Sequence, residues 1–200
     1  ASAPPHRWQS APPARALSGT QQNAAPASSR PGQTMPQGEG ADGWAAVPQH
    51  CKALGVMGVL PFLALSPPIA SALPLLPAEV VENAALLQTS YGVSIATFLG
   101  GVHWGAAMSE FGGRAASGRA ALERYFWGVT PSLVAFPAVA LPPTGSALVL
   151  AGTLLAAYAA DASFAARGLL PKWYMALRRP LTAGACAGLL ITAYHLTYLS

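Results

Sequence analysis

The sequence predicts an all-α protein: a polytopic transmembrane helical bundle of five spans that follows an extended, Pro- and Ala-rich N-terminal tail. Of the 200 residues, 52% are hydrophobic and only 9% are charged, whereas about a quarter of the residues of an average soluble domain are charged. The charged residues fall in short windows between long apolar runs, which is typical of polytopic membrane proteins. Residues 1–50 contain no such run. They are therefore predicted to form a low-complexity tail, and residues 51–200 a five-span membrane domain.

The predicted tail is rich in Ala, Pro, Ser, Gly and Gln. A segment of this composition cannot bury a core, and its backbone is extended or irregular. Arg7, Arg15 and Arg30 precede the first acidic residue, Glu39, which is the bias of an organelle transit region. A transit remnant and a mature tail both fit. Such a tail becomes ordered only by binding, so we expect it to run over neighbouring subunits.

The five predicted spans are residues 51–76, 84–108, 125–141, 146–166 and 181–199. Each is long enough, or nearly so, for the roughly 17 to 25 residues that a transmembrane helix needs. The third span is close to the lower limit. Pro61 in the first span and Pro131 and Pro137 in the third are expected to kink their helices.

The second span carries the motif expected to organise the bundle. Gly101 and Gly105 form a G-x-x-x-G step, which lets another helix approach closely. Helical spacing places these glycines in one predicted contact seam, whose members are Ser94, Phe98, Gly101, Gly105 and Met108. His103 lies about 200° round the helix from Gly101. The histidine is therefore expected to face a different neighbour.

Charge predicts the orientation. With five spans, all eleven Lys and Arg residues fall on the side of the N-terminal flank, the loop after span two and the loop after span four. The opposite side receives Glu79, Glu82 and the C-terminus. The positive-inside rule then places the N-terminus inside and the C-terminus outside.

Two ionisable residues, His103 and Asp161, are predicted at similar depth near the inside ends of their helices. They could form a proton-handling or ligand-binding pair, or a buried polar contact that fixes helix packing. Both readings stay open. His195 is predicted near the outside end of the fifth span, so the two intramembrane histidines cannot both ligate one haem. No cofactor is predicted.

The loop before the fifth span contains cationic and aromatic residues, which are Lys172, Trp173, Tyr174, Arg178 and Arg179. Trp and Tyr favour the headgroup level of a membrane, and cations favour an anionic leaflet. The loop is expected to be an interfacial anchor. The alternative is a docking site for a lipid headgroup or a partner, because guanidinium groups bind phosphate in a bidentate manner.

Several function classes find no support in the sequence. It contains no Walker loop, dinucleotide fingerprint, H-E-x-x-H motif or nucleophile elbow, so no catalytic residue is predicted. No basic stripe with interleaved aromatic residues indicates nucleic-acid binding. The two cysteines, Cys51 and Cys186, lack the paired spacing of a zinc site. No metal site is predicted.

Four segments together resemble the transmembrane protein 69 family, a group of small polytopic proteins. They read GVMGVLPFLAL, YGVSIATFLGGVHWG, VTPSLVAFPA and LLPKWYMALRRPLT. The resemblance covers residues 54–200. It implies the mitochondrial inner membrane, with the N-terminus in the matrix and the C-terminus in the intermembrane space. It implies no biochemical activity and no catalytic residue.

Two functions from different classes follow as hypotheses. The first is a non-catalytic accessory subunit of a mitochondrial respiratory-chain assembly, for example complex I, with membrane lipids and other subunits as partners. The second is a small stand-alone membrane transporter or membrane enzyme that uses His103 and Asp161. The sparse polar groups and the lack of a catalytic motif favour the first.

Overall fold

The computed structural model describes residues 43–113 and 117–199, and this part of the chain contains helices and no strand, which confirms the all-α class. The elements are η1 (Gly43–Ala46), α1 (Gln49–Ala64), α2 (Pro67–Ala72), α3 (Ala78–Glu82), α4 (Ala84–Met108), α5 (Arg119–Ala135), η3 (Phe136–Ala140), α6 (Pro143–Ala166) and α7 (Tyr174–Tyr198). The predicted tail lies almost entirely outside the described residues. The described fold begins before the predicted boundary at residue 50, since η1 and the start of α1 precede it.

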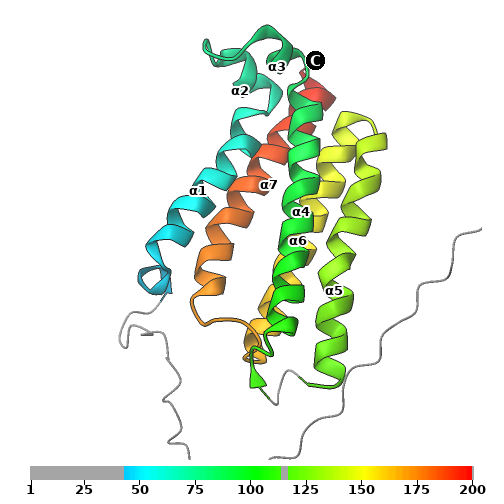
Figure 1. Ribbon diagram of the computed structural model, residues 1–200. Helices are drawn as coiled ribbons and strands as arrows, with labels where there is room; N and C mark the ends of the chain where they lie inside the picture. The colour runs from blue at the N-terminus through cyan, green and yellow to red at the C-terminus, as the bar shows by residue number, and fades with distance from the viewer. Residues whose placement is uncertain (1–42, 114–116, 200) are drawn as a thin grey trace, which may run out of the picture. The chain divides into compact units, whose positions relative to one another are not determined.

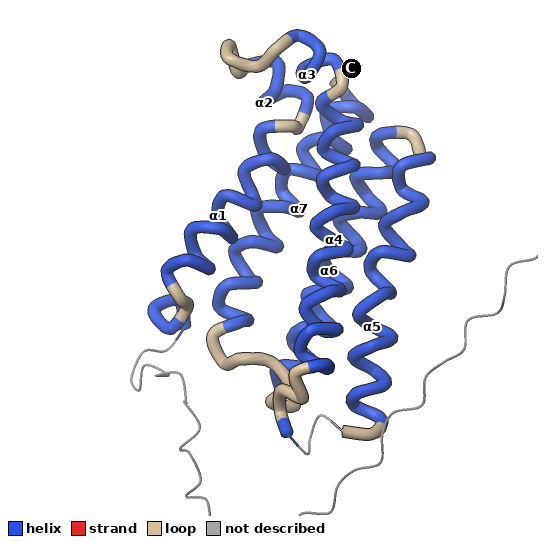
Figure 2. Tube along the Cα trace, viewed as in Figure 1, coloured by secondary structure: helices blue, strands red, loops and turns tan. Residues whose placement is uncertain are grey.

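Five long helices stand side by side, and the chain runs up and down through them (Figures 1 and 2). Helix α4 packs most extensively on α5, α6 on α7, and α1 on α7, while α4 also packs on α6. The short helices α2 and α3 lie together at one end (Figure 1). The loops after α4 and α6 lie at the other end. Helices α4, α6 and α7 contain or nearly contain the predicted second, fourth and fifth spans, whereas α1 stops at Ala64 and α5 covers only the first part of the third span, which η3 continues.

One buried stripe explains how α4 sits in the bundle. Its buried residues recur every three or four positions and are Ala84, Gln88, Thr89, Gly92, Ala96, Leu99, Gly100, His103 and Ala107. This spacing keeps one face of the helix inward. At the Gly100 position, an added Cβ atom would lie 2.3 Å from the backbone oxygen of Gly128 in α5. The two helices therefore touch backbone to backbone.

Within the described residues, the predicted glycine seam is not the face of α4 that packs on other helices. Gly101 and Gly105 are exposed, and a Cβ atom added at either would meet no atom within 4 Å. Phe98 and Met108, at the same predicted seam, are also exposed. The physical reason is a rotation of one position: Gly100 shares the inward stripe with His103, whereas Gly101 lies about 100° away from Gly100.

Other close approaches rest on small residues. A Cβ atom at Gly188 of α7 would lie 2.3 Å from the backbone oxygen of Phe62 in α1. The main apolar core combines that phenylalanine with residues such as Leu150, Leu154 and Leu189, and with many alanines of α6 and α7. Without a hydrophobic drive between helices in lipid, such close van der Waals packing is what holds membrane helices together.

The prolines act differently from one another. Pro61 lies within α1 and Pro131 within α5, and both helices continue past them. Pro137 lies in η3, where the α5 helix gives way to a 3₁₀ turn. Ser66 donates a hydrogen bond from its hydroxyl to the Leu63 carbonyl at the end of α1, before α2 starts with Pro67. The predicted first span is thus split into two helices.

In the described residues, two helices are long and apolar enough to cross a membrane, α4 and α6. The predicted count of five is not reached by this criterion. Helices α1 and α5 have 16 and 17 residues, fewer than the about 20 that a 30 Å hydrocarbon core requires. Helix α7 has 25 residues, but Arg178, Arg179 and Pro180 occupy its first turns.

We predict that Gly100→Ala destabilises the bundle, because the new methyl group meets the Gly128 carbonyl and the two helices must separate. The expected loss is about 1–3 kcal/mol in the free energy of unfolding, as for other overpacked sites. Gly101→Ala is the matched control, with a change below about 1 kcal/mol. Thermal unfolding of the two purified variants compares them directly. Equal stability would show that α4 does not meet α5 at Gly100.

Candidate functional site: a buried charge cluster

Three ionisable side chains from three helices meet inside the bundle, and we call them the charge cluster. The Nε2–H group of His103 in α4 donates to Oδ1 of Asp161 in α6, at 2.7 Å. The Nε–H group of Arg178 in α7 donates to Oδ2 of the same carboxylate, at 2.6 Å. The residues are 0%, 1% and 5% exposed, respectively. The carboxylate thus links α4 and α7 through α6.

The helices position these groups by direction and register. His103 lies near the C-terminal end of α4, Asp161 near the C-terminal end of α6, and Arg178 in the first turns of α7. Because α4 and α6 both run toward the same end of the bundle and α7 starts there, the three residues share one level. The imidazole also packs on the ring of Phe164, with ring centroids 4.6 Å apart, one turn along α6 from the carboxylate.

The carboxylate of Asp161 accepts both hydrogen bonds of the cluster. Asp161 carries one negative charge and Arg178 one positive charge, and the Nε2 proton of His103 completes the second hydrogen bond to the carboxylate. A buried ion pair that makes no further hydrogen bonds would lower the stability of the fold, because its desolvation is not compensated. Among the described residues, the Nδ1 atom of His103 and the Nη2 atom of Arg178 have no hydrogen-bond partner. The cluster therefore keeps two unused polar atoms.

The predicted anchor loop divides between the inside and the surface. Arg178 and Tyr174 are buried, with Tyr174 next to Asp161. They do not face lipid headgroups, because the start of α7 turns these two side chains into the bundle. Lys172 and Arg179 are exposed, and Trp173 is half-buried. Only these three stay available for the predicted headgroup or partner contacts.

A second buried polar cluster joins α1, α4 and α7 near the other end. The Gln88 amide nitrogen donates to the carbonyl of Phe62 at 2.6 Å and to that of Gly188 at 3.2 Å. The Thr192 hydroxyl donates to the Gln88 amide oxygen at 2.8 Å. The Phe62 carbonyl lies in the last turn of α1, where no later helical amide reaches it. Gln88 supplies the missing donor.

Arg124 forms a third buried polar site, and its side chain is fully buried. Its Nη1 atom donates to the carbonyl of Phe111, and its Nη2 atom donates to the carbonyl of Leu169, both at 2.7 Å. Phe111 follows α4 and Leu169 follows α6. The guanidinium therefore ties together the two loops at the end of the bundle where the charge cluster lies.

Sequence reasoning missed Gln88, Arg124 and the inward direction of Arg178. The signal for Gln88 was available: it lies four residues before Gly92 and eight before Ala96, on the inward stripe of α4. No comparable signal exists for the two arginines. Each lies close to other cations at a helix end, a pattern that also describes solvent-exposed flanks.

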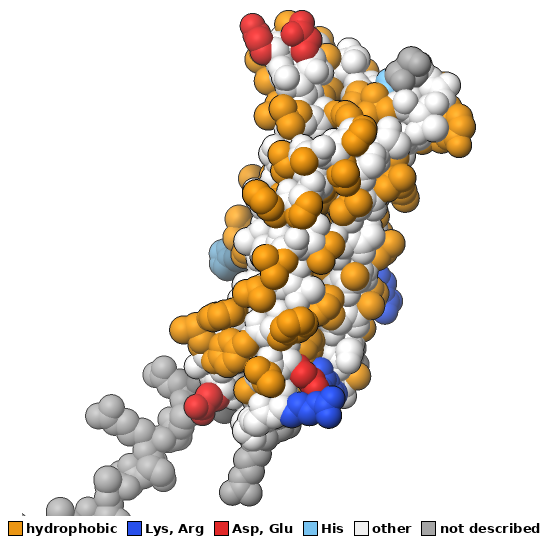
Figure 3. Space-filling view, turned by 90° about the vertical axis from the view of Figure 1, so that its right-hand side faces the viewer, with side chains coloured by type: hydrophobic (Ala, Val, Ile, Leu, Met, Phe, Trp, Pro, Cys, Tyr) orange, Lys and Arg blue, Asp and Glu red, His pale blue; other side chains and the backbone are white. Residues whose placement is uncertain are grey.

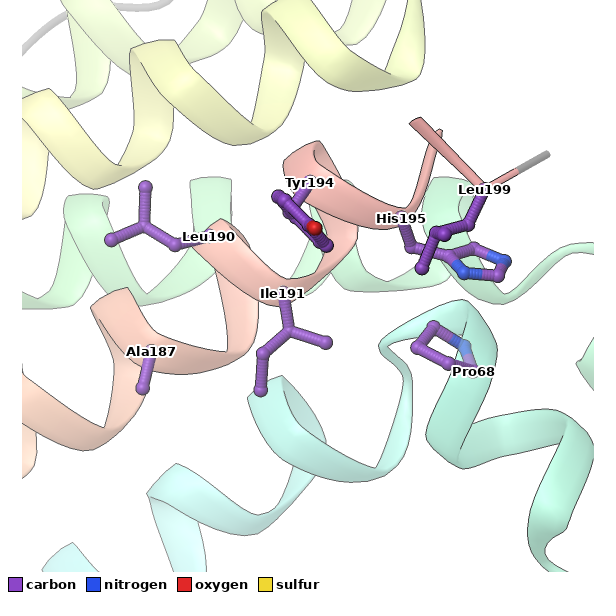
Figure 4. A pocket seen from close by; sticks show the side chains of 7 residues that line it. All are labelled: Pro68, Ala187, Leu190, Ile191, Tyr194, His195 and Leu199. Carbon is purple, nitrogen blue, oxygen red and sulfur yellow. The ribbon is translucent and has the colours of Figure 1, made fainter. Parts of the chain in front are cut away.

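Two open hollows lie away from the charge cluster. One, of about 420 Å³, is formed by α7 and Pro68, and Figure 4 shows His195, Leu199 and Pro68 at one side of it and Ile191 and Leu190 farther along. The other, of about 470 Å³, lies between α7 and the start of α6. Both are mainly apolar and lie near the C-terminal end of α7. His195 is thus far from His103, as the sequence predicted.

The described residues hold no group of three or more His, Cys, Asp or Glu side chains that could bind a metal ion. Neither hollow is lined by a member of the charge cluster. What the cluster offers chemically is a buried carboxylate with two donors on it, a proton on His103 Nε2 and a bare Nδ1 atom. This arrangement fits a permanent structural contact that joins three helices better than it fits a site that binds a substrate.

Comparison with known proteins gives one result. A family described as "protein of unknown function (DUF3429)" matches residues 47–194. Among curated proteins and among solved structures, no similar chain is found. The match begins just before α1 and ends within the last turns of α7, so it contains all three residues of the charge cluster, Gln88 and Arg124.

We predict that Asp161→Leu costs about 3–5 kcal/mol of stability, because it leaves Arg178 buried without a counter-charge. Arg178→Met is expected to cost a similar amount, since the carboxylate is then left with His103 alone. The double variant Asp161→Leu/Arg178→Met removes both charges and is expected to recover most of the loss. Unfolding in detergent, followed by circular dichroism, measures the four proteins of this cycle.

Arg179→Met is the matched control for this cycle. Arg179 is the next residue along α7 but is exposed, so its loss is expected to change stability by less than about 0.5 kcal/mol. Additive losses in the double variant, with no recovery, would show that Asp161 and Arg178 do not interact.

Proposed function

Because the chain belongs to the DUF3429 family of proteins of unknown function, we propose a function from its own geometry: a non-catalytic, membrane-embedded structural subunit of a larger assembly. We place that assembly in the mitochondrial inner membrane and among the respiratory-chain complexes. The observation that carries the proposal is the combination of an apolar outer surface with a charge cluster closed inside the bundle.

The outer surface supports the membrane part of the proposal. Large apolar side chains are exposed on every long helix, for example Leu54 in α1, Phe98 in α4, Phe126 in α5, Leu155 in α6 and Leu190 in α7. Figure 3 shows such side chains along the face on the α5 side. In the most apolar windows of α4 and α6, only 33% and 44% of the residues are buried. The core helix of a soluble protein would be mostly buried.

The bundle can cross a membrane as one unit, although among the described residues only α4 and α6 are long and apolar enough to do so alone. Helices α1, α5 and α7 pack on α4, on α6 or on one another. If α4 and α6 are embedded in the bilayer, the other three helices therefore lie in the bilayer with them. Helices α1 and α5, which are too short to cross a membrane alone, are each continued by another element. Helix α5 is followed directly by η3 up to Ala140, and α1 is followed by α2 after a two-residue turn.

The distribution of charge supports an orientation. Among the described residues, the basic side chains Lys52, Arg119, Arg167 and Lys172 lie at the end of the bundle where α1, α5 and α7 begin. The acidic pair of α3, Glu79 and Glu82, lies at the opposite end. By the positive-inside rule the basic end faces the matrix. The mitochondrial location itself is supported by the resemblance to the transmembrane protein 69 family.

The non-catalytic part rests on the closed charge cluster. A general acid or base must reach the proton that it transfers, within about 3 Å or through one water molecule. His103 is 0% exposed and Asp161 1% exposed. The two residues are hydrogen-bonded to each other, and Asp161 also accepts a hydrogen bond from Arg178. A cluster of this kind suits the fixing of helix register, a role known for buried polar groups.

The alternative is a small membrane transporter or membrane enzyme, and one observation favours it. The Nδ1 atom of His103 and the Nη2 atom of Arg178 lack partners among the described residues, and buried polar groups without partners often have a functional cause. In this reading a proton or a small anion reaches these atoms when the basic end opens.

We predict that gentle detergent extraction followed by a native gel shows this chain co-migrating with a respiratory-chain complex at fixed stoichiometry, because a structural subunit stays with its assembly. Mass spectrometry of the band identifies the partners. Migration as a free species or a small oligomer would contradict the structural-subunit proposal.

The variant Asp161→Leu/Arg178→Met separates the two functions in the same gel. It removes the charge cluster but is expected to fold. A structural subunit keeps its place in the complex and the complex keeps its activity. If the variant assembles and the activity of the complex is lost, the charge cluster acts in transport or catalysis, and the proposal is wrong.

A further inference from the structure

Two arginines at the basic end of the bundle are held in place by one carboxylate. The Nε atom of Arg119, the first residue of α5, lies 3.0 Å from Oε1 of Glu123. The Nη1 atom of Arg167, which follows α6, lies 2.6 Å from Oε2 of the same residue. The hydrogen bond from Arg167 is the largest cause that holds the pKa of Glu123 below its usual value. The trio carries one net positive charge.

The two guanidinium groups keep several N–H donors unused, since Arg119 donates only to Glu123, and Arg167 donates to Glu123 and to the carbonyl of Ser163. Arg119 uses one N–H group on Glu123, and its side chain is 91% exposed. Arg167 is 42% exposed and also lies over the ring of Phe164, with Cζ 4.5 Å from the ring centre. A guanidinium fixed in this way loses little entropy when it binds, and its planar fork matches a phosphate group.

An apolar stripe on α5 starts within one turn of Arg119. Its members are Leu122, Phe126, Val129 and Leu133, which are 69%, 70%, 38% and 70% exposed. Their spacing of four, three and four residues keeps them on one face of the helix. Figure 3, which views the bundle from the α5 side, shows charged side chains at the lower end and apolar side chains above them.

The length of the stripe matches one leaflet. Eleven residues separate Leu122 from Leu133, and at about 1.5 Å per residue this is roughly 16 Å. Half of a hydrocarbon core of about 30 Å is roughly 15 Å. This face of α5 therefore has phosphate-binding groups at one end. Above them it has an apolar surface about as long as the acyl chains of one leaflet.

We propose that this face of α5 binds an anionic phospholipid, with its phosphate on Arg119 and Arg167 and an acyl chain along the stripe. The proposal rests on the membrane embedding proposed above. Among the described residues, the exposed cations Lys172 and Arg179 share no carboxylate, so they lack the paired guanidinium groups of this site. Above Arg179 on α7, the first exposed residues at helical spacing are Ala183 and Ala187, and large apolar side chains follow only from Leu190 onward.

The test measures which lipids the purified protein retains. The chain is exchanged into nanodiscs of equal parts phosphatidylcholine and phosphatidylglycerol, extracted in mild detergent and examined by native mass spectrometry. We expect retained phosphatidylglycerol to exceed phosphatidylcholine. In Arg119→Gln/Arg167→Gln this preference is expected to fall about tenfold or more, since each basic residue near an anionic membrane surface contributes about 1 kcal/mol.

The matched control is Lys172→Gln/Arg179→Gln, which removes the same charge from exposed residues of the same end. Because these residues were themselves predicted to contact headgroups, the control is expected to lower the preference, but by less than the Arg119→Gln/Arg167→Gln variant. A third variant, Phe126→Ser/Leu133→Ser, keeps both arginines and is expected to retain less of either lipid. Because all three variants change exposed or half-exposed residues, their melting temperatures should stay close to that of the unchanged protein.

Three results would overturn the site: no lipid preference in the unchanged protein, an equal loss in the control, or full retention in the stripe variant. The last would indicate that the arginines bind phosphate alone. These outcomes differ from a failure of the membrane proposal. In that case the protein would be soluble and monodisperse without any detergent.

Discussion

The carboxylate of Asp161 is the point on which the arrangement of the bundle depends. It accepts one hydrogen bond from α4 and one from α7, at 2.7 Å and 2.6 Å, and so fixes the relative rotation of three helices. Apolar contacts alone would tolerate small rotations, because dispersion forces have little direction. A buried carboxylate does not tolerate such rotations, because the loss of a hydrogen-bond partner leaves its charge uncompensated.

The polar contacts can form only because small residues bring the helices close. Gly100 meets the backbone of α5, and Gly188 meets the backbone of α1 at Phe62. That second approach places the Phe62 carbonyl within reach of Gln88. Directional hydrogen bonds and close backbone contacts therefore specify the same packing. The outer surface of the described residues, in contrast, exposes many large apolar side chains, as the proposed contact with lipid requires.

Much of this fold could be predicted from the sequence, and the reason is helix length. Apolar runs separated by charged windows predict long helices, and all five are present. His103 and Asp161 were predicted to lie at a similar depth, and in the bundle they lie at one level and are hydrogen-bonded to each other. The number of membrane spans was less well predicted, since Pro67 and Pro137 shorten α1 and α5 in ways that hydropathy does not register.

The sequence could not indicate which helix face meets a neighbour. Gly101 and Gly105 form a recognisable motif, yet Gly100, one residue away, makes the contact with α5. Arg178 and Arg179 are identical in type, and only the structure shows that one is buried on Asp161 and the other exposed. Arg124 was hidden for the same reason. A cation near a helix end is compatible with solvent, lipid headgroups or two backbone carbonyls.

The central claim is that the bundle crosses a membrane with its basic and acidic ends on opposite sides. The most direct measurement uses single cysteines introduced at Glu82 or Lys172 after Cys51 and Cys186 have been replaced by alanine. Sealed membrane vesicles are treated with a maleimide that cannot cross the bilayer. We expect only one of the two positions to react, and the other to react after detergent is added. Equal reaction of both positions in sealed vesicles would contradict the claim.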